Sequence, residues 1–203
     1  MAKWHGFGRC KTRLSRDIGK SNSAKVQSVM TSHTISVAKS LQKIKLIDIS
    51  IAISGLGEKN CRRWSRKLGI KRFNLQGKGC LGEKMKRQIN INKKFCTQNN
   101  IKNIIFIGTD LPDLCHLDLL NTLRELKQND LILGPSNDGG YWLIGLSEKL
   151  ISQYLNLPFI NIKWSKQSVL KNTIDNFASI KLKYKFLDKK IDIDRMIDIE
   201  NRK

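Results

Sequence analysis

Hydrophobic and polar positions follow one another along the chain in segments that predict helices and strands in turn. Residues 23–42 carry apolar side chains at the spacing of an amphipathic helix. Residues 46–54 alternate around four isoleucines and stop at Gly55, a pattern typical of a strand. The same criteria predict further helices over 58–68, over 116–128, over 165–178 and through Met85 and Ile89 to about Asn99. They predict further strands over 70–75, 130–133, 141–146 and 181–186.

The segment from Ile104 to Asp113 combines a strand pattern with candidate chemistry. Its apolar run stops at Gly108 and is followed by a hydroxyl and a carboxylate, on Thr109 and Asp110. A short apolar run bounded by turn formers predicts a fully buried strand, and Pro112 ends it. Ligands bind beyond the carboxyl ends of such strands in open α/β sheets, although Asp110 could equally cap a turn.

The alternation of strands and helices predicts an α/β fold, a three-layer α/β/α sandwich with a mostly parallel sheet. At 203 residues the chain fits one domain, residues 1–203. A glycine loop that binds phosphate normally follows a strand, and the pattern shows none before residue 4. We therefore expect the first strand of the fold to lie upstream of Met1.

Composition excludes several classes of protein. No apolar run approaches the roughly 20 residues of a membrane span, and no signal peptide follows Met1. The five cysteines are scattered and never in CxxC spacing, which indicates reduced thiols and a cytoplasmic location. Oligomeric state is not indicated.

The formal net charge of +21 makes nucleic acid a candidate partner. The lysines are spread over the whole chain with abundant isoleucine and asparagine, so AT-rich coding is a rival cause. No RNA- or DNA-binding motif accompanies them, and aromatic residues make up only 7%. Specific nucleic-acid binding is therefore not expected, and a positive potential around an anionic substrate is the simpler use of the charge.

Two groups of charged residues suggest a phosphate site and a metal site. In residues 1–13, Gly6 and Gly8 punctuate a loop whose cations fall on alternate positions, Arg9, Lys11 and Arg13. Backbone N–H groups near glycines and alternating cations suit phosphate oxygens, although a basic loop can simply be solvated. Carboxylates from separate strands suit Mg²⁺ or Mn²⁺ shared with substrate phosphates. The candidates are Asp110 with Asp192 and Asp194; the late pair could instead cap a helix, and Asp138 could be a plain turn residue.

Six motifs together resemble the DUF2064 family of the GT-A nucleotide-diphospho-sugar transferase superfamily, often labelled arsenosugar-biosynthesis glycosyltransferases. They span nearly the whole chain, and the Gly-Thr-Asp and Asp-Gly-Gly-Tyr blocks are the most specific. The motifs are Gly-Arg-Cys-Lys-Thr-Arg-Leu (8–14), Gln-x-x-Gly-x-Leu-Gly-x-x-Met (76–85), Ile-Gly-Thr-Asp-x-Pro (107–112), Leu-Gly-Pro-x-x-Asp-Gly-Gly-Tyr-x-Leu-Ile-Gly-Leu (133–146), Trp-Ser (164–165) and Asp-Ile-Asp-x-x-x-Asp (192–198).

The resemblance implies a role for each matched position. Phosphate-binding residues would be Gly8, Arg9, Lys11 and Arg13, with Thr109 beside the nucleotide. Residues against the base or ribose would be Gln76, Gly79 and Gly82. Asp110 would bind the metal, with Asp192 or Asp194 as the second ligand. The acceptor side would be lined by Asp138, Gly139, Gly140 and Tyr141.

The sequence departs from the family pattern at four places. Two lie in the nucleotide-binding motifs: His5-Gly6-Phe7 replaces a proline-rich segment, and Cys80 replaces an aspartate. The others are Lys166 after Trp-Ser and Arg195 after Asp194, each in place of threonine. The Cys80 change removes a carboxylate that could touch ribose or sugar.

The resemblance implies a metal-dependent transferase that uses a nucleotide-activated donor and a small-molecule acceptor. The family label favours a glycosyltransferase that moves a sugar from an NDP-sugar, with Lys11, Asp110 and Asp194 as catalytic residues. The alternative is a nucleotidylyltransferase that couples an NTP to a phosphorylated acceptor and releases pyrophosphate. The single Asp110, in place of a paired Asp-x-Asp, favours that alternative. A basic nucleic-acid-binding module and a non-catalytic family member are the outside alternatives.

Overall fold

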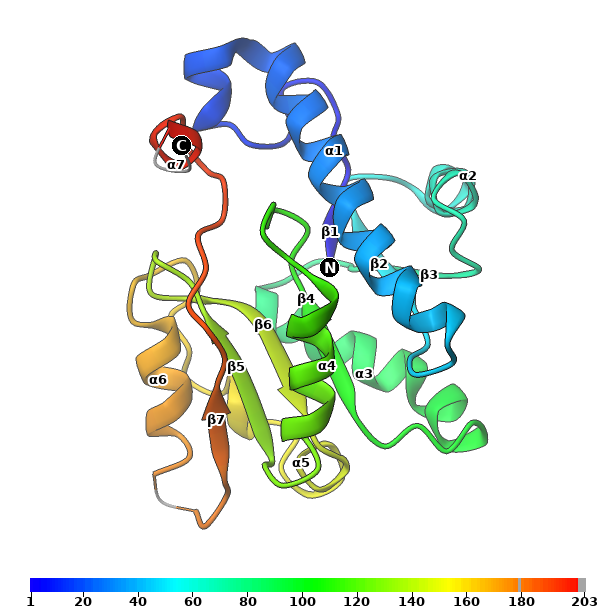
Figure 1. The fold of residues 1–203 in the computed structure, drawn as a ribbon, viewed down its shortest axis with the longest axis vertical. Helices are drawn as coiled ribbons and strands as arrows, with labels where there is room; N and C mark the ends of the chain where they lie inside the picture. The colour runs from blue at the N-terminus through cyan, green and yellow to red at the C-terminus, as the bar shows by residue number, and fades with distance from the viewer. Residues whose placement is uncertain (179, 201–203) are drawn as a thin grey trace. The chain divides into compact units, whose positions relative to one another are not determined.

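A computed structural model describes residues 1–178 and 180–200 as a mixed α/β fold with helices and strands in alternation (Figure 1). This confirms the predicted fold class. Contacts between Cα atoms divide the chain into two compact units. Unit 1 holds Met1–Gln76, Gly108–His116 and the chain from Ile191 onward, and unit 2 holds Gly77–Ile107 and Leu117–Lys190. The predicted single domain over 1–203 is not tested by this division and stays a prediction.

Unit 1 is built on a parallel sheet in the order β1-β2-β3. Its strands are β1 (Ala2–Lys3), β2 (Ser50–Ser54) and β3 (Arg72–Leu75). β1 pairs in parallel with β2 and directly precedes the basic loop, so a strand before that loop does exist within the chain. The expectation that it would lie upstream of Met1 is corrected here, because a two-residue strand contains no alternating pattern to detect.

The core of unit 1 lies where β2 meets helices α1 (Leu14–Lys43) and α2 (Glu58–Lys67). Ile51 and Ile53 pack with Ile35 of α1 and with Cys61 and Trp64 of α2. Ala52, which points to the other face of the strand, is buried as well. Both faces of β2 are therefore covered, as is usual for a parallel strand.

Helix α1 is longer than the predicted 23–42 and contains a break. Gly19 has a non-helical backbone, with φ 79° and ψ 159°, so a short first segment precedes the long one. The first segment holds Leu14, whose side chain packs with Met30 and with Ile193 near the end of the chain. This cluster connects the start of α1 to the segment that carries the late aspartates. That segment includes the short helix α7 (Ile197–Glu200).

Unit 2 holds a second sheet in the order β4-β6-β5-β7. The strands are β4 (Ile104–Ile107), β5 (Leu131–Pro135), β6 (Tyr141–Leu146) and β7 (Tyr184–Phe186). β6 is antiparallel to both β4 and β5, while β7 is parallel to β5, so β6 alone runs against the others. The helices are α3 (Leu81–Gln98), most of α4 (His116–Glu125), α5 (Glu148–Gln153), the 3₁₀ helix η1 (Leu157–Phe159) and α6 (Val169–Asp175).

Two expectations for unit 2 are corrected. All four residues of β4 are only partly buried, because β4 is an edge strand that pairs on one side. The helix expected over 165–178 begins only at Val169, because Ser165 adopts a left-handed backbone with φ 64°. In the part of the chain that the structure describes, no helix is long and apolar enough to cross a membrane.

Candidate nucleotide and metal site

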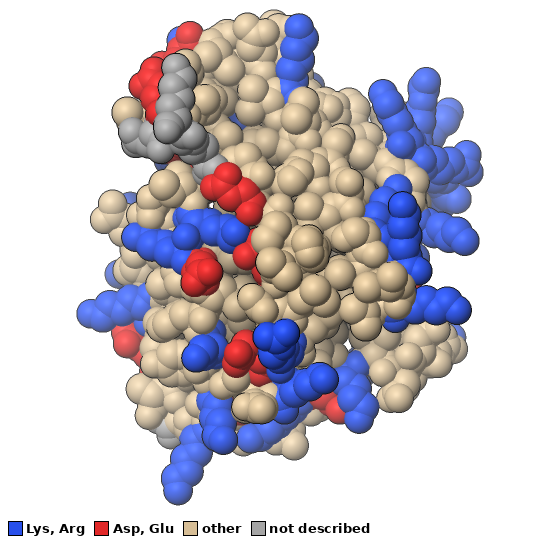
Figure 2. Space-filling model, in the orientation of Figure 1, with Lys and Arg blue, Asp and Glu red and all other residues tan. Residues whose placement is uncertain are grey.

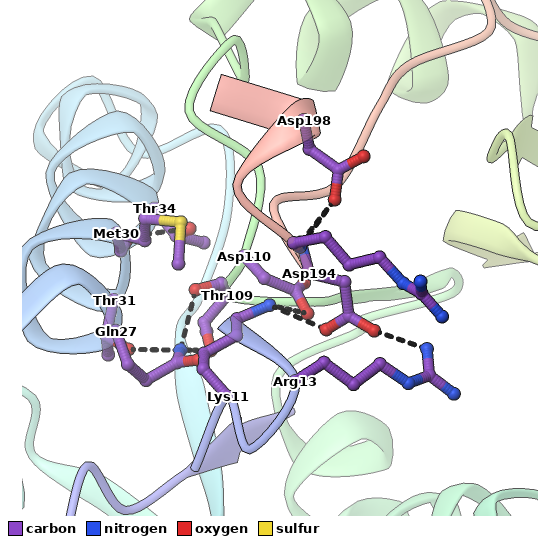
Figure 3. A network of polar contacts seen from close by, with 11 residues as sticks. Lys11, Arg13, Gln27, Met30, Thr31, Thr34, Thr109, Asp110, Asp194 and Asp198 are labelled. Carbon is purple, nitrogen blue, oxygen red and sulfur yellow. Dashed lines mark hydrogen bonds and ion pairs between the residues drawn. The ribbon is translucent and has the colours of Figure 1, made fainter. Parts of the chain in front are cut away.

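A cluster of four charged side chains in unit 1 contains the three residues predicted to be catalytic (Figure 3). The Nζ atom of Lys11 lies 3.1 Å from Oδ2 of Asp110 and 3.5 Å from Oδ1 of Asp194. Nη1 of Arg13 lies 2.7 Å from the other oxygen, Oδ2, of Asp194. Two carboxylates are therefore balanced by two cations.

Burial differs sharply within this cluster. The side chain of Lys11 is 4% exposed, whereas those of Asp110 and Asp194 are 37% and 39% exposed. Arg13 is 62% exposed. The ammonium is thus enclosed beneath two carboxylates that still reach solvent, and a ligand would meet the carboxylates and Arg13 first.

Backbone contacts place Asp110 and Asp194 together although they are far apart in the sequence. The N–H of Ile193 donates to the carbonyl oxygen of Asp110 at 3.1 Å. Oδ2 of Asp198 accepts from the N–H groups of Asp194 and Arg195 at 2.8 and 2.7 Å. The carboxylate of Asp198 therefore shapes the turn that presents Asp194.

A buried polar network supports the loop that carries Asp110. Nε2 of Gln27 donates to the carbonyl oxygen of Thr109 at 3.0 Å and lies 3.3 Å from its hydroxyl. Gln27 and Thr31, one turn apart on α1, are 5% and 1% exposed and hydrogen-bonded to each other. Both oxygens of Thr109 thus contact Gln27, so Thr109 helps to hold the loop; its predicted place beside the nucleotide stays a prediction.

Sequence reasoning missed Gln27, but a signal was present. Gln27, Thr31 and Thr34 recur at positions i, i+4 and i+7, within the apolar stripe of the predicted helix. Polar residues at that spacing lie on the buried face of a helix and need hydrogen-bond partners.

The glycine loop has the conformation that its composition suggests. Gly8 has φ 68°, in a region that residues other than glycine rarely occupy. The N–H of Arg9 donates to the carbonyl oxygen of Gly6. The side chain of Arg9 is exposed, whereas those of Lys11 and Arg13 turn to the aspartates. The three alternating cations are therefore not equivalent.

His5, which stands where the family has a proline-rich segment, packs against two tryptophan rings that also contact each other. Its ring centroid lies 4.2 Å from Trp4 and 5.4 Å from Trp64. Burial of the ring lowers the pKa of His5, and the charge of Lys67 lowers it further. His5 is thus a packing residue of this loop.

Gln76 also has a structural role. Its Nε2 donates to the carbonyl oxygens of Ala2 and Ala52 at 3.1 and 3.0 Å, and the residue is 6% exposed. The side chain thereby ties the end of β3 to β1 and β2. Its predicted contact with base or ribose is not tested.

The predicted acceptor residues lie in unit 2 and form a tight turn. Oδ1 of Asp138 accepts from Ser136 Oγ at 2.5 Å and from the N–H of Gly140 at 3.0 Å. Gly139 has φ 83°, and a Cβ there would lie 2.1 Å from the carbonyl oxygen of Gln167. One carboxylate oxygen of Asp138 is therefore used within the turn, and Gly139 is required for close packing.

Two further motif residues of unit 2, Gly82 and Tyr141, meet at Trp164, and a third, Gly79, lies at the start of α3. A Cβ on Gly82 would lie 2.7 Å from Cζ2 of Trp164, so only glycine fits. The ring of Tyr141 packs edge-on to Trp164 at 6.4 Å, and burial raises the pKa of its phenol. Gly79 precedes Cys80, whose N–H donates to Glu83 Oε2 at 2.8 Å at the start of α3. Motifs distant in the sequence are thus brought together by packing.

The donor set of the unit 1 cluster suits a hard divalent cation. Within residues 1–178 and 180–200, no group of three or more His, Cys, Asp or Glu side chains could hold a metal. Two carboxylates nevertheless converge, and Mg²⁺ typically uses one or two carboxylates and takes its remaining ligands from water and substrate phosphates. The residues present therefore fit Mg²⁺ or Mn²⁺. Of the two late aspartates, Asp194 is the one that shares Lys11 with Asp110.

Comparison with solved structures identifies the fold as that of the nucleotide-diphospho-sugar transferases. A crystal structure from Desulfovibrio desulfuricans G20, of a protein provisionally described as such a transferase, matches with a TM-score of 0.80 and 25% identity. The match covers 98% of this chain and 81% of that chain. Residues 37–166 match the family described as an uncharacterized protein conserved in bacteria, DUF2064, and the chain belongs to this family.

A second solved structure shares the fold at lower identity. The 4-diphosphocytidyl-2C-methyl-D-erythritol synthase of Anaerococcus prevotii DSM 20548 matches with a TM-score of 0.56 and 13% identity, over 85% of this chain and 86% of that one. Likeness at this identity concerns the fold alone. No curated protein matches the chain.

Proposed function

We propose that the protein is a cytoplasmic, metal-dependent transferase that takes its donor as a nucleotide-activated compound. The proposed donor is an NDP-sugar, from which a glycosyl group passes to a small-molecule acceptor. The proposed site is the cluster of Lys11, Arg13, Asp110 and Asp194, with Mg²⁺ or Mn²⁺ as cofactor.

The observation that carries this proposal is the convergence of Asp110 and Asp194 on one enclosed ammonium, in a chain with this fold. Ion pairs on a protein surface contribute little to stability. Stability alone therefore does not explain why two partly exposed carboxylates share one buried lysine. Burying a charge is costly unless it is well paired, so such a cluster more often serves a function than stability.

Each residue of the cluster suits one part of the reaction. Asp110 and Asp194 would hold the divalent cation, which when bound offsets negative charge on the donor phosphates. Lys11 is a compact charge on a flexible stem and would turn toward a phosphate oxygen of the leaving group. Arg13, already largely exposed, would take phosphate oxygens in a bidentate manner. All three effects stabilise the nucleoside diphosphate that leaves.

Nucleotidylyl transfer is the second candidate, and one observation favours it. Asp110 does not belong to a paired Asp-x-Asp motif, since the positions two residues before and after it are Gly108 and Pro112. In that reaction a phosphate oxygen of the acceptor attacks the α-phosphorus of an NTP, and the bond to the departing pyrophosphate breaks.

The test is calorimetric titration of UDP-, GDP- and ADP-sugars and of free NTPs, each with and without Mg²⁺ or Mn²⁺. We expect metal-dependent binding that Asp110→Asn weakens at least about tenfold, since even outer-shell partners of a metal cost 10–100-fold. Asp48→Asn is the matched control, because Asp48 is an exposed carboxylate of the same unit. Circular dichroism verifies that both variants fold.

Three results would change the conclusion. Binding of NTPs alone would replace the glycosyl reaction by nucleotidylyl transfer. Nucleotide binding that survives Asp110→Asn unchanged would remove the proposed site. Salt-dependent binding of duplex or RNA with no nucleotide binding would instead identify a nucleic-acid-binding module.

A further inference from the structure

Lys11 occupies the place that a shared metal ion would need. A cation that bridges Asp110 and Asp194 must approach an oxygen of each, and the Lys11 ammonium already lies within 3.5 Å of both. In the close-up the ammonium faces neighbouring oxygens of the two carboxylates from one side, and Arg13 contacts the other oxygen of Asp194 (Figure 3). The divalent cation and the ammonium therefore compete for the same oxygens.

From this competition we propose that Lys11 is a built-in counter-ion that keeps the carboxylate pair closed to a divalent cation until a nucleoside diphosphate arrives. The released ammonium then binds a phosphate, so metal and diphosphate bind cooperatively. This inference rests on the proposed function, since it concerns the regulation of the same site.

The charges of the cluster support the proposal. Asp110 and Asp194 are already neutralised by Lys11 and Arg13. A divalent cation added to this balanced set leaves an excess of positive charge close to an enclosed ammonium, and like charges at such distances repel strongly. A diphosphate carries several negative charges and removes the excess, so the two ligands favour each other.

The backbone at Lys11 is strained, and strained residues cluster at functional sites. Lys11 has φ 45°, a left-handed conformation that is uncommon for residues other than glycine and costs free energy. The N–H of Ser15 donates to its carbonyl oxygen at 2.8 Å, where the first turn of α1 begins. The strained residue is thus anchored at the start of α1 by its backbone.

The first experiment measures Mn²⁺ alone, by electron paramagnetic resonance of the free ion, with no nucleotide present. Lys11→Met removes the competing charge at similar length, and we expect it to bind Mn²⁺ about 5–150-fold more tightly than the natural protein, the usual range of a coupling between sites. Lys11→Arg keeps the charge and should bind Mn²⁺ as weakly as the natural protein. Lys25→Met, which removes an exposed lysine of the same unit, should have no effect.

The second experiment uses only the natural protein and so does not depend on the folding of a variant. Mn²⁺ affinity is measured with saturating UDP, saturating GDP, uridine or no addition. We expect a diphosphate to raise Mn²⁺ affinity, Mn²⁺ to raise diphosphate affinity by the same factor, and uridine to leave Mn²⁺ affinity unchanged.

Two results would overturn the inference. One is a folded Lys11→Met protein that binds Mn²⁺ no more tightly than the natural protein. The other is a natural protein that binds Mn²⁺ equally well with and without a diphosphate. Neither result requires the donor to be known, and both differ from failure of the proposed function, in which Asp110→Asn leaves nucleotide binding unchanged.

Discussion

At the scale of single residues, the proposed site depends on the enclosed ammonium of Lys11, which contacts the carboxylates of Asp110 and Asp194. Asp110 could be predicted because a carboxylate at the end of an apolar run stands out locally. The resemblance placed Lys11 and Asp194 in one site, but local pattern does not pair them, because they are 183 positions apart and no periodicity relates them. Gln27 lies between these cases, since its polarity on an apolar helix face is visible but its partner, Thr109, is not.

Replacing Gln27 by leucine tests the network beneath the site. The variant Gln27→Leu leaves the buried carbonyl oxygen of Thr109 without this donor, which should lower the free energy of unfolding by about 1–3 kcal/mol. Urea denaturation monitored by tryptophan fluorescence measures the change. Gln42→Leu, half-buried near the far end of the same helix, should change it by less than about 0.5 kcal/mol. Equal effects of the two variants would contradict the assigned role of Gln27.

At the scale of elements, strong periodicity predicted where most helices and strands occur but not how they begin and end. The helix expected over 23–42 is the later part of α1. Gly19 has a non-helical backbone, but the chain is helical on both sides of it. β1 escaped prediction because two residues show no period. The absence of helix over 165–168 was not predicted, because a serine does not reveal in the sequence that its backbone is left-handed.

The break at Gly19 makes a specific demand on residue type. Its φ of 79° and ψ of 159° lie in a region that is essentially restricted to glycine, although a Cβ there would meet no atom within 4 Å. Gly19→Ala should therefore lower the free energy of unfolding by about 1–3 kcal/mol through backbone strain alone. Ser21→Ala, two residues further along in an exposed helical position, should be neutral or slightly stabilising. Thermal unfolding of both variants checks this, and an unchanged Gly19→Ala protein would show that the break is not needed.

At the scale of the whole molecule, charge is the dominant property. Lysine and arginine number 38 against 17 aspartates and glutamates, which gives the formal net charge of +21. Blue side chains gather along the right-hand edge of Figure 2, where Figure 1 shows α2. This helix carries exposed cations at Lys59, Arg62, Arg63, Arg66 and Lys67, and its apolar residues Cys61 and Trp64 face the core.

This excess charge predicts that salt stabilises the protein. Repulsion among like charges opposes the folded state, and it is screened over about 10 Å at 0.1 M salt. Raising KCl from about 20 mM to about 300 mM should raise Tm by about 2–4 °C, equivalent to about 1 kcal/mol for a chain of this size. A triple variant with Arg63, Arg66 and Lys67 changed to glutamine should show a weaker dependence in differential scanning calorimetry. A Tm that falls with salt would mean that ion pairs outweigh repulsion.

The sequence by itself predicted the α/β class and the family, which are confirmed, and it supplied the candidate residues of the proposed site. The class depends on local patterns, which are periods of two or about three and a half residues and glycines at turns. The family, and the roles that the resemblance implies for the candidate residues, depend on the six motifs. Only the tertiary structure decided that Asp110 and Asp194 meet at the ammonium of Lys11, and that Thr109, Gln76 and Asp138 hold backbone in place. The reason is physical: such contacts are set by how packed elements bring distant segments together, and local pattern carries no record of that distance.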